Sequence, residues 1–298
     1  MTVDHFYGAV KNRTMMAFGN FERWKSEMAR LFYSMMWFTF CASCMAFVQI
    51  NGDSMFADYQ ASSAMRLEST SHIRDMFFEL LPIIRTISVV NPDFILHLFI
   101  TTSLISGLYQ WGPLLLVAKV RRYFWIYGTG YLLRMCTLAF TVMPPSNPAC
   151  VPLRRTFLES LFITPHLLLS HVHTCTDKIF SGHTLVATLL LCFWFEASND
   201  FRWRGYALFS WCSMVSTSLM GRCHYTVDIT VAFIVAMLIY WVYRLLLMIG
   251  ELTRQCPDLY LSKKVAHLYP IISLICWCDG LDLAYSTDNP FDSLEPGV

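Results

Sequence analysis

Charged side chains are scarce in this sequence. Aspartate, glutamate, lysine and arginine make up 14% of its 298 residues, whereas they make up about a quarter of an average soluble domain. Hydrophobic residues account for 55% and aromatic residues for 15% of the chain. This composition excludes an ordinary soluble domain and predicts an all-α, polytopic membrane protein.

A low net charge, the lack of a signal-peptide pattern and the lack of a metal-binding cysteine pattern narrow the function further. The formal net charge of +1 offers no electrostatic footprint for nucleic acid. The chain does not open with a basic stretch, a short apolar run and a small-residue cleavage site, so we expect no cleaved signal peptide. The cysteines include one CxxC pair, Cys41 and Cys44, and its position inside an apolar run indicates packing rather than metal binding.

Long apolar runs are abundant, and six of them are candidates to cross a bilayer, which takes about 20 residues per helix. A basic and aromatic segment, residues 1–30, is expected to lie on the cytosolic surface, and residues 250–298 form a polar tail. Gly112-Pro113 predicts a kink, and residues 119–122 predict a basic turn between two spans. A shorter apolar segment, 156–169, contains Pro165 and is expected to lie over the site. The predicted spans are residues 31–50, 94–118, 123–143, 179–195, 203–221 and 226–249.

Lysine and arginine set the orientation of these spans. They are more frequent in the amino-terminal segment, the 119–122 turn, the 202–204 turn and the tail than in the remaining loops. The positive-inside rule therefore places both termini in the cytosol. With six spans, the fourth and the sixth then begin on the lumenal or exoplasmic side.

A histidine stands at the start of each of these two spans. CTDKIFSGHT (175–184) contains His183, and CHYTVD (223–228) contains His224. Asp228 follows His224 by four residues, so the two share a helix face and the carboxylate can orient the imidazole. Alone, a Ser-Gly-His sequence is common by chance, and a histidine with an aspartate one turn later is more often a capping or buried polar pair. Because the predicted topology brings both to one side of the membrane, we predict one site with His183, His224 and Asp228 as catalytic residues.

This combination suits transfer of a phosphorus-centred group. One histidine attacks phosphorus, and the other protonates the leaving oxygen and then activates the acceptor. The developing negative charge needs cations and amides. We predict these from Arg134, a charge near the middle of a span, from Arg222, and from the free backbone amides where Ser181 and Gly182 open a helix. No third ligand stands at metal spacing, so we expect neither a metal nor a cofactor.

The two motifs resemble those of the lipid phosphatase and phosphotransferase superfamily. More narrowly, they are similar to the third and fourth motifs of the sphingomyelin synthase family, which read roughly CGDxxFSGHT and HYTxDV. Residues 121–144, RRYFWIYGTGYLLRMCTLAFTVMP, resemble the second motif, and residues 74–82, RDMFFELLP, a degraded first motif. Thr176 departs from the usual glycine, and a Leu-Pro pair is missing before Asp75. The KxxxxxxRP motif of the broader lipid phosphatases is absent from the sequence.

The resemblance implies a ceramide phosphotransferase. A phosphocholine head group would pass from phosphatidylcholine through His224 to the primary hydroxyl of ceramide, releasing diacylglycerol. Asp228 would orient His224, His183 would be the acid and base, and Asp75, Asp177 and Arg134 would support substrate binding. A phosphatidylethanolamine donor, a phospholipase C-like or lipid phosphate hydrolase, and a non-catalytic lipid binder are the alternatives. The expected location is the Golgi or plasma membrane, with the endoplasmic reticulum as the alternative, and homo-oligomerisation is left open.

Overall fold

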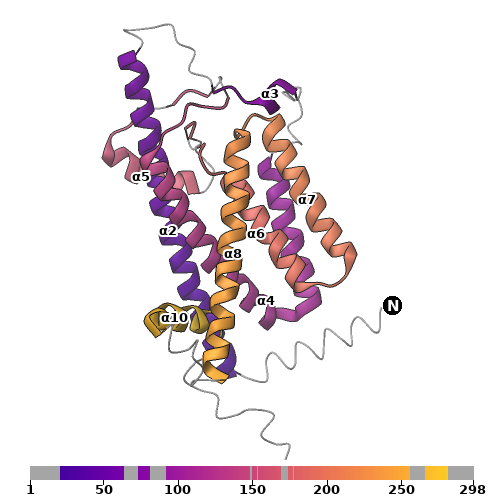
Figure 1. Cartoon of the computed structure of the whole chain (residues 1–298). Helices are drawn as coiled ribbons and strands as arrows, with labels where there is room; N and C mark the ends of the chain where they lie inside the picture. Colours follow the sequence, from indigo (N-terminus) through magenta and orange to yellow (C-terminus); the bar gives the residue numbers. More distant parts are fainter. Residues whose placement is uncertain are drawn as a thin grey trace, which may run out of the picture.

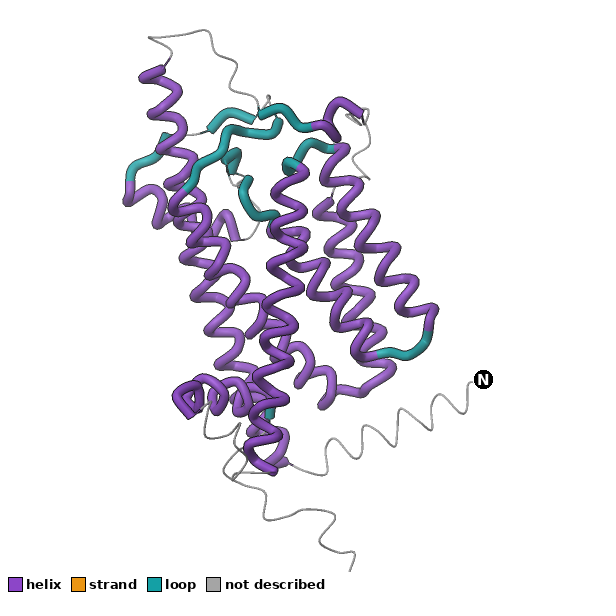
Figure 2. Tube along the Cα trace, viewed as in Figure 1, coloured by secondary structure: helices purple, strands orange, loops and turns teal. Residues whose placement is uncertain are grey.

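The computed structural model describes residues 21–63, 73–80, 92–147, 150–152, 154–168, 174–176, 178–255 and 266–280. Every regular element in these segments is a helix, as Figures 1 and 2 show. The predicted all-α class is therefore confirmed for the described part of the chain.

The first described helix, α2 (Phe21–Ser63), is 43 residues long. At 1.5 Å per residue it extends for about 65 Å, roughly twice the thickness of the bilayer hydrocarbon. It contains no proline, which explains why it continues beyond both ends of the predicted 31–50 span. The predicted domain boundary at residue 30 consequently falls inside a helix.

Helix α4 (Pro92–Phe140) consists of two arms that meet at a kink. Gly112 has φ 72° and ψ 174°, and Pro113 follows it. A positive φ favours glycine, and proline cannot donate to the helical hydrogen-bond ladder, so the helix breaks at this pair. The predicted kink is confirmed. The predicted turn at residues 119–122 is wrong, because these residues lie inside the second arm, where no helix breaker occurs.

The two arms of α4 return to the same end of the molecule. Asp93 at the start of the first arm lies 2.5 Å from His183 (Oδ1 to Nε2). Arg134 near the end of the second arm packs against Gly182, the first residue of α6. Figure 1 shows the arms joined at the opposite end of the helical bundle. The kink thus brings residues from both ends of α4 to one site.

The remaining helices complete the bundle. Helix α5 coincides with the shorter apolar segment predicted at residues 156–169. It packs against α2, where the Phe47 and Phe157 rings are 5.3 Å apart. Figure 1 shows α6, α7 and α8 beside α4, with the short α3 above α7. The bounds are α3 (Met76–Leu80), α5 (Phe157–Leu168), α6 (Gly182–Ala197), α7 (Phe201–Met220), α8 (Thr226–Gln255), a 3-10 turn (Ala266–Leu268) and α10 (Tyr269–Asp279).

Helices α2, α4 and α8 are the three helices in the described segments that are long and apolar enough to cross a membrane. Helix α6 is apolar but has 16 residues. Large apolar side chains such as Phe40, Phe140 and Trp241 are exposed on the outside of the bundle, as expected where lipid rather than water surrounds a protein. The structure is thus that of a membrane-embedded helical protein. Six crossings and cytosolic termini stay predictions.

An ionic cluster lies at the end of the bundle away from His183, where α6 ends. Arg122 binds Glu196 at 2.8 Å and Asp279 at 2.6 Å, and Arg244 binds Glu196 at 2.8 Å. Asp279 belongs to α10, whose buried Ile272 and Cys276 join the core of the bundle. The predicted tail boundary at residue 249 therefore falls inside α8, and part of the predicted tail packs onto the bundle.

Candidate active site

His224 and Asp228 form a buried pair at the start of α8. Their exposed fractions are 4% and 0%, and His224 Nδ1 lies 3.6 Å from Asp228 Oδ2. The same carboxylate oxygen accepts a hydrogen bond from the Tyr225 amide at 2.9 Å. The first turn of α8 therefore fixes the carboxylate beside the imidazole, and the other ring nitrogen of His224 is left for chemistry.

His183 forms a second pair with a carboxylate that the sequence interpretation missed. Its Nε2 lies 2.5 Å from Asp93 Oδ1, and the two side chains are 27% and 42% exposed. Asp93 stands 90 residues earlier in the chain, in the first turn of α4. One available signal was its place at the start of the second predicted span, which begins on the same side of the membrane as His183.

The two imidazoles face each other across one space. Their ring centroids are 6.0 Å apart and their planes are inclined at 62°. One ring can therefore attack a phosphorus atom while the other reaches an oxygen bonded to it. The structure brings together all three predicted catalytic residues and adds Asp93.

Burial lowers the pKa of His224 well below its usual value, and the positive charges of Lys178, His183 and Arg134 lower it further. Burial acts this way because a charged imidazolium is disfavoured away from water. At neutral pH the ring is therefore unprotonated, which is the form that can act as a nucleophile.

Arg134 is buried against the start of α6, with 4% of its surface exposed. A Cβ atom on Gly182 would lie 2.8 Å from Arg134 Nη1, so the glycine of the SGHT motif makes room for the guanidinium. This contact places the predicted cation one residue from His183.

Ser181 links the two histidine motifs. Its hydroxyl accepts a hydrogen bond from the Thr184 amide at 3.3 Å and caps α6, and its own amide donates to the Asp228 carbonyl at 3.3 Å. The prediction that this amide is free for substrate is therefore wrong, because it is used to join the starts of α6 and α8.

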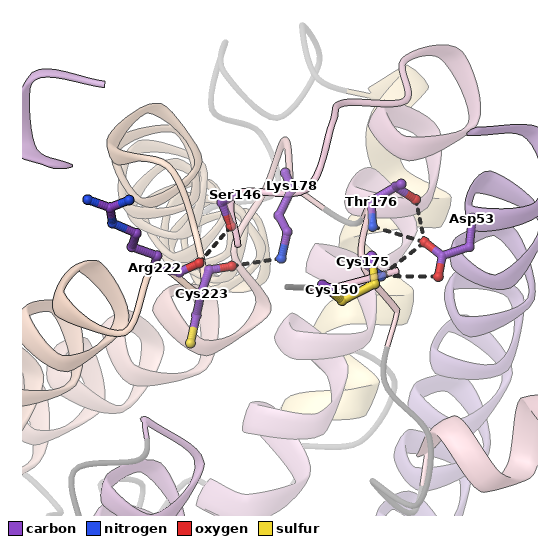
Figure 3. The surroundings of a disulfide bond; sticks show 8 residues. All are labelled: Asp53, Ser146, Cys150, Cys175, Thr176, Lys178, Arg222 and Cys223. Atoms are coloured by element: carbon purple, nitrogen blue, oxygen red, sulfur yellow. Dashed lines mark hydrogen bonds between the residues drawn. A yellow bond between two sulfur atoms is a disulfide. The ribbon is translucent and has the colours of Figure 1, made fainter. Parts of the chain in front are cut away.

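The segment before α6 is tied to its neighbours, as Figure 3 shows. Cys175 forms a disulfide with Cys150, a pairing that sequence analysis did not identify. Buried Asp53 of α2 accepts hydrogen bonds from the Cys175 amide at 3.0 Å, the Thr176 amide at 2.9 Å and the Thr176 hydroxyl at 2.6 Å. The threonine that replaces the usual glycine thus gains a partner for its hydroxyl.

Lys178 is a buried cation that sequence analysis also missed. It is 8% exposed, and its Nζ donates to the Cys223 carbonyl at 2.7 Å, next to His224. Figure 3 shows Lys178 between the disulfide and the turn that contains Arg222 and Cys223. It connects the segment before His183 to the segment that carries His224.

Three other predicted substrate-binding residues have different positions. Arg222 lines the same cavity as His183 and His224 and has φ 49°. Its guanidinium donates to the Phe78 carbonyl at 3.2 Å and points away from Lys178 in Figure 3. Both carboxylate oxygens of Asp75 bind Thr226, to the amide at 2.6 Å and to the hydroxyl at 2.8 Å, at the start of α8. Asp177 lies outside the described residues.

The two histidines open into a cavity of about 850 Å³. Arg134, Lys178 and Asp93 line it at the same end, and apolar side chains of α2, α4 and α6 line most of the remainder. Among the described residues, no group of three or more His, Cys, Asp or Glu is arranged to hold a metal ion. The site therefore combines paired histidines, fixed cations and a cavity whose apolar walls suit a hydrophobic ligand.

Residues 174–245 match the family model described as PAP2 superfamily C-terminal. Mouse phosphatidylcholine:ceramide cholinephosphotransferase 2 is 31% identical over 188 residues, covering 56% of this chain and 48% of the relative. The human cholinephosphotransferase 1 is 33% identical over 137 residues, 41% of this chain and 33% of the relative. Sphingomyelin synthase-related 1 of Caenorhabditis elegans is 31% identical over 132 residues, which cover 40% of this chain and 27% of the relative.

The chain is similar to sphingomyelin synthases. The resemblance inferred from its motifs is therefore confirmed, although the chain spans about half or less of the length of these curated relatives. The matched segment contains both histidines and Asp228, whereas Asp93 and Arg134 precede it. Relative to the matched segment, α4 thus supplies an additional carboxylate and a cation to the sphingomyelin synthase-like site.

Proposed function

We propose that this protein is a ceramide phosphotransferase that moves phosphocholine from phosphatidylcholine to the primary hydroxyl of ceramide and releases diacylglycerol. The observation that carries the proposal is the pair of His–Asp units in one cavity, whose imidazole ring centroids are 6.0 Å apart. Each unit suits one of the two roles that the reaction requires.

In the first half-reaction, the ring nitrogen of His224 turned away from Asp228 attacks the phosphorus of the donor. A phosphorus–nitrogen bond forms as the bond to the diacylglycerol oxygen breaks. His183 gives its proton to that oxygen, and Asp93, 2.5 Å from its Nε2, orients the ring. Diacylglycerol leaves, and the phosphocholine group stays on His224.

The second half-reaction reverses these roles. His183, now neutral, accepts the proton of the ceramide hydroxyl, and the ceramide oxygen attacks phosphorus. The phosphorus–nitrogen bond breaks and returns the electron pair to His224. Every proton released in this step is held by His183, which restores the starting enzyme.

Two buried cations offset the charge that develops on the phosphoryl oxygens. Arg134 lies against Gly182, and Lys178 approaches the turn before His224. Fixed charges of this kind act strongly in a site shielded from water. Asp75 and Ser181 contribute by holding the starts of α8 and α6 in place.

A phosphatidylethanolamine donor is the second candidate. The Asp93 carboxylate is 42% exposed beside His183, and it is an acceptor of the kind that an ethanolamine ammonium requires. Choline is our first choice because two of the three relatives named above are phosphatidylcholine:ceramide cholinephosphotransferases.

We propose a Golgi or plasma membrane location with the site on the lumenal or exoplasmic side. The Cys150–Cys175 disulfide adjoins the histidine end of the bundle. Disulfides form and persist in oxidising compartments and are rare on the cytosolic side, which supports this orientation. The endoplasmic reticulum is the alternative location.

The test is a mixed-micelle assay with both donors labelled in the head group, with and without ceramide. We expect ceramide-dependent transfer of phosphocholine, a drop of at least about a thousandfold in His224→Ala, and normal transfer in His267→Ala, the same change at an exposed position. Full transfer by His224→Ala would overturn the mechanism. Release of soluble phosphocholine that ignores ceramide would show a hydrolase instead.

A further inference from the structure

The cavity that contains the two histidines extends far beyond them. Trp111, Leu116 and Lys119 also line it, and these residues flank the kink of α4 at the other end of the bundle. From Asp93 to Trp111 the first arm advances 18 residues, which corresponds to about 27 Å of helix. The cavity therefore runs through most of the thickness of a bilayer hydrocarbon core.

The walls between the two ends are predominantly apolar. Three helical segments each contribute a stripe of residues spaced three or four apart, so the same helix faces line the cavity along its length. The polar Ser103 in this stretch accepts a hydrogen bond from Trp194 Nε1 at 2.9 Å. The stripes are Leu96, Ile100 and Leu104 on the first arm, Val120, Phe124 and Tyr127 on the second, and Val186, Leu190 and Phe193 on α6.

Lys119 and Trp111 form the far end. The Lys119 ammonium lies 4.7 Å from the centre of the Trp111 ring. Trp111 is held in place, because its ring is 5.7 Å from that of Trp194 and a Cβ on Gly107 would lie 2.8 Å from it. A lysine can line an apolar space with its stem while its ammonium reaches polar surroundings, and here the ammonium interacts electrostatically with Glu196 and Asp279 of the ionic cluster.

We propose that this cavity holds one hydrocarbon chain of the lipid substrate and that Lys119, packed on Trp111, sets the longest chain that fits. A chain that extended further would have to displace the lysine or strip water from a charged ammonium, which is strongly unfavourable. The proposal rests on the proposed function, because the reacting phosphorus or hydroxyl must stand at the histidines while the chain points towards Lys119. The donor and then ceramide occupy the cavity in turn.

Two substitutions move the limit in opposite directions. Lys119→Ala removes the stem, and we expect the preferred chain to lengthen by about three or four carbons, the length of a lysine stem. Leu190→Trp narrows the cavity about 10 Å from His183 along α6, and we expect a preference for short chains. Leu115→Ala is the matched control, because this side chain is exposed on the outside of the same arm; it should leave the profile unchanged.

The measurement is transfer from a fixed donor to a series of ceramides with increasing N-acyl chain length. A parallel measurement uses native mass spectrometry of the detergent-purified His224→Asn protein, alone or combined with each substitution, to read which ceramides of the series it retains. Opposite shifts in both readouts support the proposal. Identical chain profiles in Lys119→Ala, Leu190→Trp and the unmodified chain would overturn it. If binding shifts but no variant transfers a head group, the chain limit stands and the proposed function fails.

Discussion

The two His–Asp pairs of the site differ in almost every physical respect. The His224–Asp228 pair is local in sequence and buried, with exposed fractions of 5% and 0% for the side chains. The His183–Asp93 pair joins two helices across 90 residues and is 27% and 42% exposed. A nucleophile benefits from burial, which keeps it unprotonated, whereas a group that shuttles protons must meet the leaving and entering oxygens. The difference therefore supports the proposed roles, with His224 as the nucleophile and His183 as the acid and base.

The largest expected effect comes from replacing each histidine and then changing the leaving group of the donor, which separates the two roles. His183→Ala should lower phosphocholine transfer from phosphatidylcholine by about a hundred- to ten-thousandfold, the usual contribution of a general acid and base. A donor such as p-nitrophenyl phosphocholine needs no protonation of its leaving oxygen, so a single-turnover burst of nitrophenol should be largely restored in His183→Ala, while later turnovers stay slow because transfer to ceramide still needs His183 as the base. The same donor should not restore His224→Ala.

Asp93→Asn tests the exposed pair without deleting the histidine. It should behave as a weaker His183→Ala, with a slowed burst for the natural donor and a normal burst for the nitrophenyl donor. His267→Asn is the control, because His267 is exposed. His97→Asn is unsuitable, because His97 lines the cavity. If the nitrophenyl donor restored His224→Ala and not His183→Ala, the two roles would have to be exchanged.

A smaller effect is expected at Lys178, which adjoins the buried pair. Its positive charge helps to lower the pKa of His224, so Lys178→Met should raise that pKa. More of the nucleophile is then protonated at a given pH, and the acidic limb of kcat/KM should move to higher pH. The rate above this limb should fall by about a hundredfold, the lower end of the cost of losing one preorganised donor.

The same pKa has a consequence for stability. Since the folded state holds His224 below its unfolded pKa of about 6.5, the unfolded state binds more protons in acid. Stability against unfolding should therefore decline as pH falls below that value, and Lys178→Met should weaken this decline. An acidic limb that stays in place in Lys178→Met would show that the lysine does not act on His224.

Sequence reasoning predicted the buried pair but not the exposed one, for a physical reason. A spacing of four residues keeps His224 and Asp228 close together where a helix begins, whatever the rest of the fold does, although His224 precedes Thr226, the first residue of α8, and so does not share a helix face with Asp228 as predicted. The approach of Asp93 to His183 depends on how two helices pack, and the Cys150–Cys175 disulfide depends on how two loops meet. The kink at Gly112 was predictable from the Gly-Pro pair. That this kink is the turn between the two arms was not predictable, because the structure was needed to show that the helix continues without a break through Arg121.

The smallest expected effect distinguishes two interpretations of Asp75, which the sequence assigned to substrate binding. In the structure it holds the Thr226 amide and hydroxyl at the start of α8, so it supports the buried pair and not the exposed one. Losing such a cap costs about 1 kcal/mol. Asp75→Ala should therefore lower the unfolding temperature in detergent by about 2–4 °C and reduce kcat a few-fold at unchanged KM. Asp58→Ala, which removes an exposed ion pair with Arg154, should change neither. An unchanged unfolding temperature with a strongly raised KM for the donor would instead place Asp75 on the substrate, since a cap acts through the helix and not through binding.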